Sequence, residues 1–190
     1  TFDSGGGIYS RDPNILSQIF SLLTWTEILL KKIEFELTES NKLIILKVAP
    51  ILRSLRHSDG SLLGFRGKTE YPTKHLDRAL INSGVKHSLP KREAMGYARL
   101  GRKNVSIFVD TGGQFDSVTE GNFLDTKSAI EITINKCPFI ISGAKATDMA
   151  GKPRGNVNKI HNSSALKLGN ELVNVVNLQP ANLEWIESKT

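Results

Sequence analysis

The segment DPNILSQIFSLLTWTEILLKK, residues 12–32, carries the pattern on which the fold prediction depends most. Asp followed by Pro predicts the start of a helix, because an Asp side chain accepts hydrogen bonds from the free amides of the first turn and Pro fits the first helical position. The apolar residues that follow recur at helical spacing. We therefore predict a helix over residues 13–30 that packs into the core, with a helix that binds a partner or a membrane surface as the alternative.

Strand patterns dominate the rest of the chain. In residues 33–37 apolar residues alternate with Glu34 and Glu36, and residues 43–48 are a second apolar run after a turn-rich connection. This pair predicts a β-hairpin that Pro50 ends. Further strands are expected over residues 104–110, 129–134 and 139–141, and a hairpin with a two-residue turn at Gly169 and Asn170. Besides the first helix, we expect a short helix over residues 74–81, a helical turn over 91–98 and a surface loop over 142–162.

Length and composition indicate a folded protein. A chain of 190 residues, with 39% hydrophobic and 23% charged residues, is long enough to bury a core as one domain. Three consecutive glycines predict a flexible arm over residues 1–11, followed by a single α+β domain over residues 12–190. The predicted fold is α+β and β-rich, with the N-terminal helix packed on a mostly antiparallel sheet that closes into a sandwich or a jelly roll.

The centre of the chain is strongly basic. Residues 50–103 hold twelve Lys and Arg against four Asp and Glu, a net charge of +8, while the whole chain carries +6. Such concentrated positive charge is typical of surfaces that bind the phosphates of nucleic acid or of an anionic membrane. A solvated charged surface is the alternative. The run ending in Gly67, Lys68 and Thr69 does not fit a phosphate-binding loop, because Leu62 stands where the first glycine is required.

Aromatic residues lie among the basic ones, which favours RNA or single-stranded DNA, since bases stack on aromatic rings while Arg and Lys neutralise phosphates. The predicted nucleic-acid-binding residues are Arg53, Arg56, Arg66, Lys68, Lys74, Arg78, Lys91, Arg92, Tyr97, Arg99, Arg102 and Lys103. Phe65 and Tyr71 are further candidates for stacking. We expect a non-enzymatic structural protein that binds nucleic acid and forms homo-oligomers, such as a viral coat or movement protein. A viral matrix-type protein that docks on anionic membrane, with Phe65, Leu62 and Leu63 as its apolar contacts, is the alternative.

The strand predicted over residues 104–110 leads into Asp110, Thr111 and Gly112. Asp-Thr-Gly after an apolar strand resembles the catalytic loop of retroviral-type aspartic proteases. The resemblance implies that two subunits each supply Asp110, and that the two carboxylates share one proton and activate a water molecule. A turn between two strands is the alternative interpretation of the same residues.

Residues that would bind a metal or a cofactor are not grouped in the sequence. Cys137 is the only cysteine, and the four histidines include no pair at i,i+3 or i,i+4, so we expect no metal site. We expect no cofactor either, because no dinucleotide glycine fingerprint or serine nucleophile elbow is present. One cysteine and no visible secretory signal lead us to expect an intracellular, cytoplasmic protein or a virion component.

Overall fold

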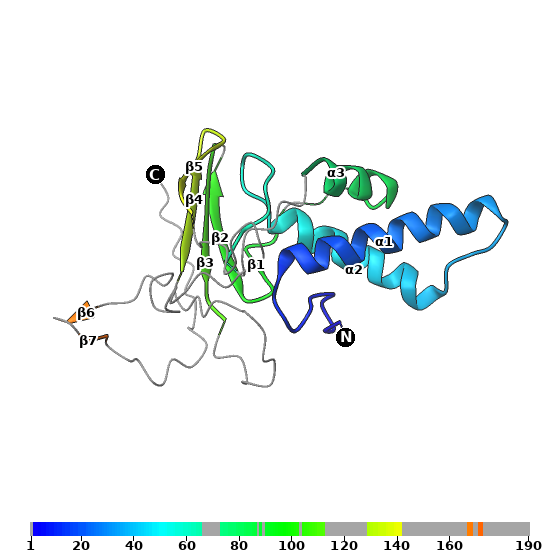
Figure 1. Cartoon of the computed structure of the whole chain (residues 1–190), viewed down its shortest axis with the longest axis horizontal. Coiled ribbons are helices and arrows are strands. Elements are labelled where there is room, and N and C mark those ends of the chain that lie inside the picture. The colour runs from blue at the N-terminus through cyan, green and yellow to red at the C-terminus, as the bar shows by residue number, and fades with distance from the viewer. Residues whose placement is uncertain are drawn as a thin grey trace, which may run out of the picture.

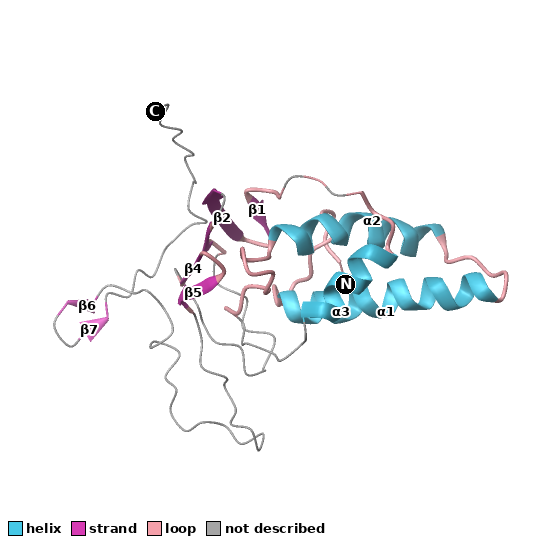
Figure 2. Ribbon diagram, turned by 90° about the horizontal axis from the view of Figure 1, so that it is seen from above, coloured by secondary structure: helices cyan, strands magenta, loops and turns pink. Residues whose placement is uncertain are grey.

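Three helices and a five-stranded antiparallel sheet make up most of the described chain (Figure 1). The computed structural model describes residues 2–65, 73–86, 88, 90–102, 104–112 and 129–141, and the backbone of two short strands at 167–168 and 171–172. The helices are α1 (Pro13–Lys32), α2 (Glu39–Ser54) and α3 (Thr73–Asn82). α1 packs against both α2 and α3, and the helices lie together to one side of the sheet (Figures 1 and 2).

The predicted N-terminal helix is confirmed, including its start. The Asp12 carboxylate accepts a hydrogen bond from the Asn14 amide at 2.8 Å, and Pro13 occupies the first turn, where its missing amide costs no helical bond. One side of α1 is buried, with Leu16 and Phe20 fully enclosed. α1 is therefore a core helix.

The hairpin predicted over residues 33–48 is wrong, because residues 39–54 form α2. Four of the buried residues of α2 lie at positions i, i+3, i+4 and i+7 and so line one helical face: Ile45, Val48, Ala49 and Leu52. Burial of this stripe outweighs the strand-like pattern of the segment. Pro50, which was expected to end a strand, lies inside the helix.

The sheet consists of β1 (Glu93–Ala94), β2 (Tyr97–Arg102), β3 (Val105–Asp110), β4 (Ile130–Ile134) and β5 (Cys137–Ile140). The spatial order of the strands follows the chain, and every neighbouring pair is antiparallel. β3, β4 and β5 confirm the strands predicted over these segments. The helical turn expected over residues 91–98 is wrong, because a tight turn at Met95 and Gly96, both with positive φ, joins β1 to β2.

Two smaller elements also agree with the sequence. α3 confirms the short helix predicted over residues 74–81. β6 (Lys167–Leu168) and β7 (Glu171–Leu172) pair antiparallel, as predicted for the hairpin around Gly169 and Asn170. The α+β class with an antiparallel sheet is thereby confirmed, whereas closure into a sandwich or jelly roll is not. The loop predicted over 142–162 lies outside the described residues.

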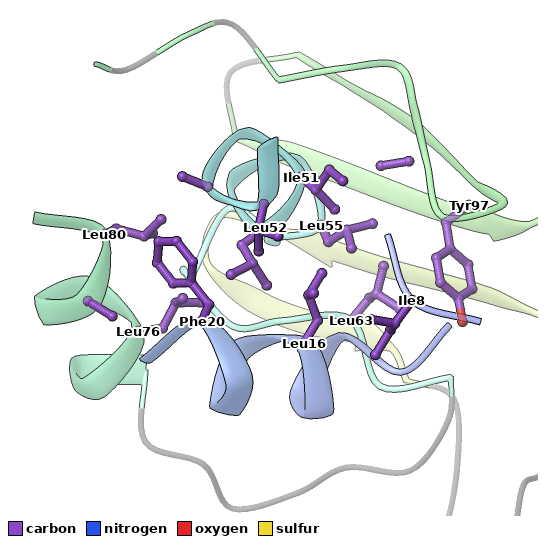
Figure 3. Close-up of a cluster of buried hydrophobic side chains, with 14 of the residues drawn as sticks. Ile8, Leu16, Phe20, Ile51, Leu52, Leu55, Leu63, Leu76, Leu80 and Tyr97 are labelled. Atoms are coloured by element: carbon purple, nitrogen blue, oxygen red, sulfur yellow. The ribbon is translucent and has the colours of Figure 1, made fainter. Parts of the chain in front are cut away.

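A hydrophobic core joins the helices to the sheet (Figure 3). Phe20 of α1 lies beside Leu80 of α3 at one end of this core. Ile8, Leu63 and Tyr97 lie at its other end, toward the sheet. The core therefore fixes the helices against one face of the sheet.

Residues 2–11, predicted to be a flexible arm, follow a defined path over the core. The Asp3 carboxylate accepts hydrogen bonds from the amides of Gly5 and Gly7, both at 2.8 Å. Gly6 has a φ of 94° and lies against Lys47, so a side chain at this position would be strained and would collide with the α2 backbone. These contacts position the three glycines, and the flexibility of the arm stays a prediction.

Candidate nucleic-acid interface

Four of the predicted nucleic-acid-binding side chains are exposed to solvent. They lie on α3 and in the segment that leads into β1, and they are Lys74, Arg78, Lys91 and Arg92. Arg66, Lys68 and Lys103 lie outside the described residues, as does the side chain of Arg102. Lys74 and Arg78 give the exposed side of α3 positive charge.

Three other predicted contact residues are partly buried, and two of them bond within the fold. The Arg53 guanidinium donates to two backbone carbonyls after α3, at 2.7 and 3.1 Å. Arg56 forms an ion pair with Asp77 of α3 at 2.7 Å. Burial lowers the pKa of Arg99 and, likewise, that of Arg53, because a desolvated guanidinium is less stable in its charged form. These half-buried groups are less accessible to a phosphate than the exposed four.

Tyr97, the aromatic residue of the predicted site, is not available to stack on a base. It is fully buried, its ring stacks on Phe65 with the centroids 5.4 Å apart, and its hydroxyl donates to the Arg11 carbonyl at 2.8 Å. Phe65 is also fully buried. Both rings fill the core between the helices and the sheet, which corrects the prediction that they contact nucleic acid. Tyr71 lies outside the described residues.

A groove of about 580 Å³ lies between α1 and α3. Its lining includes Trp25 and Leu22 of α1, which each expose 61% of their surface, and Arg78 and His75 of α3. The volume is within the range of sites that bind small ligands. An exposed indole and a guanidinium that line one groove suit a flat, aromatic group that carries a negative charge, such as a nucleotide.

Positive charge on α3 extends beyond the groove itself. Lys74 precedes Arg78 by four residues, so the two side chains lie on one face of the helix. Lys91 and Arg92 are not among the described residues that line the groove. The structure therefore brings one predicted basic residue, Arg78, to a groove that Trp25 of another helix also lines, and Lys74 lies one turn away on the same face of α3.

Sequence reasoning missed Trp25 because it precedes the basic segment and belongs to a helix interpreted as core. A usable signal was present in α1. Leu22, Trp25 and Leu29 recur at intervals of three and four, yet all three are exposed, on a different side from Leu16 and Phe20. A second apolar stripe on one helix indicates a second contact surface.

A separate polar cluster is buried between the loop after α2 and the sheet. His57 lies 3.1 Å from the Ser106 hydroxyl through Nδ1 and 3.0 Å from the Glu131 carboxylate through Nε2. Glu131 also accepts from the Gly64 amide, and Ser106 from the Ser58 amide. The arrangement of a serine, a histidine and an acid resembles a catalytic nucleophile with its base. Ser106 is fully buried, however, so no substrate reaches its hydroxyl in this structure. The cluster fastens the loop to β3 and β4.

Asp110, the first residue of the predicted Asp-Thr-Gly loop, is buried and paired. Its carboxylate forms an ion pair with Arg11 and accepts a hydrogen bond from the Gly112 amide at 3.0 Å. Arg11 also donates to the carbonyls of Met95 and Gly96, both at 2.7 Å. This pairing with a guanidinium differs from the two carboxylates that share a proton in an aspartic protease. The contacts favour the interpretation of the loop as a turn.

Neither metal-binding residues nor comparison with known proteins assigns a function to the described residues. Within the described ranges, no group of three or more His, Cys, Asp or Glu is placed to hold a metal ion. The described helices include none with the length and apolar character needed to cross a membrane. No family model, curated protein or solved structure matches the chain.

Proposed function

We propose that this protein binds single-stranded nucleic acid, either RNA or DNA, in the groove between α1 and α3, in a structural rather than catalytic role. The observation that supports this most is the exposed Trp25 in the lining of the same groove as Arg78. Basic charge alone is also found on solvated surfaces. An exposed aromatic ring beside it is the combination that unpaired bases and their phosphates need.

Binding in this groove has two physical contributions. A base stacked on Trp25, with Leu22 beside it, gains about 1–3 kcal/mol from stacking. The phosphates on either side of that base are neutralised by Arg78 and Lys74. Each phosphate neutralised on a single strand contributes about −0.7 to the slope of log affinity against log salt concentration. Affinity therefore falls as salt is added, while the stacking contribution remains.

The proposal is tested by measuring the binding of a labelled single-stranded RNA by fluorescence anisotropy across a salt series. A length of about 12 nucleotides is within the usual site size of such proteins. Trp25→Ala should weaken binding by about 5- to 150-fold, the range that corresponds to loss of one stacked base. Arg78→Gln should weaken binding and reduce the salt slope by about 0.7.

The matched control is Lys136→Gln, which removes one exposed positive charge from the turn between β4 and β5. It should leave RNA affinity nearly unchanged. If Trp25→Ala binds RNA as tightly as the unmodified protein, or if the control weakens binding as much as Arg78→Gln, the groove is not the binding site.

Docking on an anionic membrane through the same side of the molecule is a second candidate function. Leu22, Trp25 and Leu29 are exposed along α1, whose last turn carries Lys31 and Lys32. An exposed apolar stripe with basic residues nearby is typical of helices that lie in the membrane interface.

Two of the three apolar contacts expected from the sequence are not available for this second function, because Leu63 and Phe65 are fully buried, while Leu62 is partly buried against the core. Leu29→Ser separates the two functions, since Leu29 is not among the described lining residues of the groove. A membrane-docking protein should lose affinity for phosphatidylserine vesicles in this variant. A nucleic-acid-binding protein should keep its RNA affinity.

A further inference from the structure

The guanidinium of Arg99, on β2, is a partly buried cation without a counter-charge in the described part of the chain. Its Nε lies inside the protein and has no hydrogen-bond partner. Burial lowers the pKa of Arg99, and no carboxylate among the described residues raises it again. Burial also lowers the pKa of Arg53, but Arg53 donates to two backbone carbonyls. Arg99 therefore differs from Arg53 because its buried donor is left without an acceptor.

The register of the sheet places Arg99 beside a buried ring and a second guanidinium. Arg99 pairs with Phe108 of β3, and its guanidinium carbon lies 5.9 Å from the centre of that fully buried ring. The Arg99 amide donates to the Arg92 carbonyl at 2.7 Å, one position beyond the pair of Glu93 and Ala98. Residues directly opposite each other share a side of the sheet, and successive residues alternate. Arg92 therefore lies on the same side as Arg99, and Glu93 on the other.

A second buried donor without a partner borders the same strand. The Ser58 hydroxyl has no hydrogen-bond partner, while the Ser58 amide donates to the Ser106 hydroxyl at 3.0 Å. Ser106 and Phe108 are two residues apart on β3, so their side chains lie on one side of the sheet. The unpartnered groups of Ser58 and Arg99 thus border neighbouring positions on this side.

We propose that Arg99 binds a phosphate group. A buried charge is unfavourable unless it is paired, and desolvated charges are concentrated at functional sites. The Nε–H and Nη–H on one edge of a guanidinium form a fork that matches two oxygens of a phosphate, and partial burial strengthens these bonds because water competes less. A phosphate has further oxygens for the Ser58 hydroxyl and for Arg92, which a carboxylate lacks. Arg99 is not among the described lining residues of the α1–α3 groove, so this site does not depend on the function proposed for the groove.

Titration of the full chain with inorganic phosphate at constant ionic strength tests the site. In NMR spectra, one arginine Nε–H resonance and the amides of β2 should shift saturably as phosphate binds. Arg99→Lys keeps the charge but loses the fork, so it should remove that resonance and weaken phosphate binding by about 10- to 150-fold, the range of one charge-assisted hydrogen bond. Arg53→Lys is the matched control, because Arg53 is also partly buried but already bonded, and it should bind phosphate as the unmodified protein does.

Thermal unfolding provides a second measurement, which also covers a variant that folds poorly. Phosphate stabilises most proteins because it is excluded from their surface, whereas binding at one site adds a rise that saturates. The unfolding midpoint of the unmodified protein should show the saturable rise, and that of Arg99→Met should not. Without phosphate, Arg99→Met should not lower the midpoint, because it removes an unpaired charge, whereas Arg53→Met should lower it, because two carbonyls lose their donor.

Single-stranded RNA distinguishes two sources of the phosphate. Displacement of inorganic phosphate by RNA would identify the site as a contact for a nucleic-acid backbone, and phosphate that stays bound would identify a small phosphate-bearing ligand. Absence of any saturable response in the unmodified protein, or an equal response in Arg99→Lys, would overturn the proposal.

Discussion

Glu131 joins the sheet to the loop after α2, and its removal tests whether this polar cluster stabilises the fold. Glu131→Ala would leave the Gly64 amide and the His57 ring without their acceptor in a buried site. Each unsatisfied group costs about 1–3 kcal/mol, so we expect the free energy of unfolding to fall by about 3 kcal/mol. Urea denaturation measures the change.

The control for this variant is Glu36→Ala, which removes an exposed carboxylate bonded to Lys42 at 2.8 Å. The lowered pKa of Glu36, caused first by its hydrogen bond to Lys42, belongs to a solvent-exposed pair. Such pairs contribute little to stability, so the denaturation midpoint should not move. Equal midpoints for both variants and the unmodified protein would show that the buried cluster does not stabilise the fold.

Asp110 is expected to stabilise the fold rather than to act in catalysis. Asp110→Asn would keep the shape of the side chain but leave the largely buried Arg11 guanidinium without its counter-charge. Breaking a buried ion pair in this way costs about 3–5 kcal/mol. Thermal unfolding should show the loss. Peptide cleavage by the unmodified protein that disappears in Asp110→Asn, with unchanged stability, would instead support the aspartic protease.

At the scale of the element, two substitutions in α2 distinguish the observed helix from the strand that the sequence predicted there. Leu46 and Val48 would share one face of a strand but lie on different sides of a helix. In α2 Val48 is 1% exposed and Leu46 is 55% exposed. Val48→Ala should lower the free energy of unfolding by roughly 2 kcal/mol, while Leu46→Ala should change it by less than about 0.5 kcal/mol. Equal losses would contradict the helix.

The sequence predicts some elements well because their local signals and their tertiary contacts agree. The Asp12-Pro13 start of α1 and the alternation in β4 are local properties that burial reinforces. In α2 the local pattern and the tertiary contacts conflict. The run over residues 43–48 is apolar enough to resemble a buried strand, and only packing against α1 selects the stripe Ile45, Val48, Ala49 and Leu52.

At the scale of the whole molecule, the buried polar cluster and the groove both arise from contacts that no local pattern contains. His57 and Glu131 are 74 residues apart in the chain, and Trp25 and Arg78 line one groove only because α1 packs on α3. The net charge of the central segment predicted that α3 would be basic. It did not predict that Tyr97 would be drawn into the core, because burial of an aromatic ring depends on the elements around it.

The central claim is that a nucleic-acid base stacks on Trp25, and the fluorescence of Trp25 tests it most directly. The chain has two tryptophans, so Trp185→Phe leaves Trp25 as the only indole. The account predicts saturable quenching by single-stranded RNA at the concentrations that change anisotropy. Heparin, a polyanion without bases, should compete for the site without quenching. RNA binding that leaves Trp25 fluorescence unchanged, or equal quenching by heparin, would contradict the account.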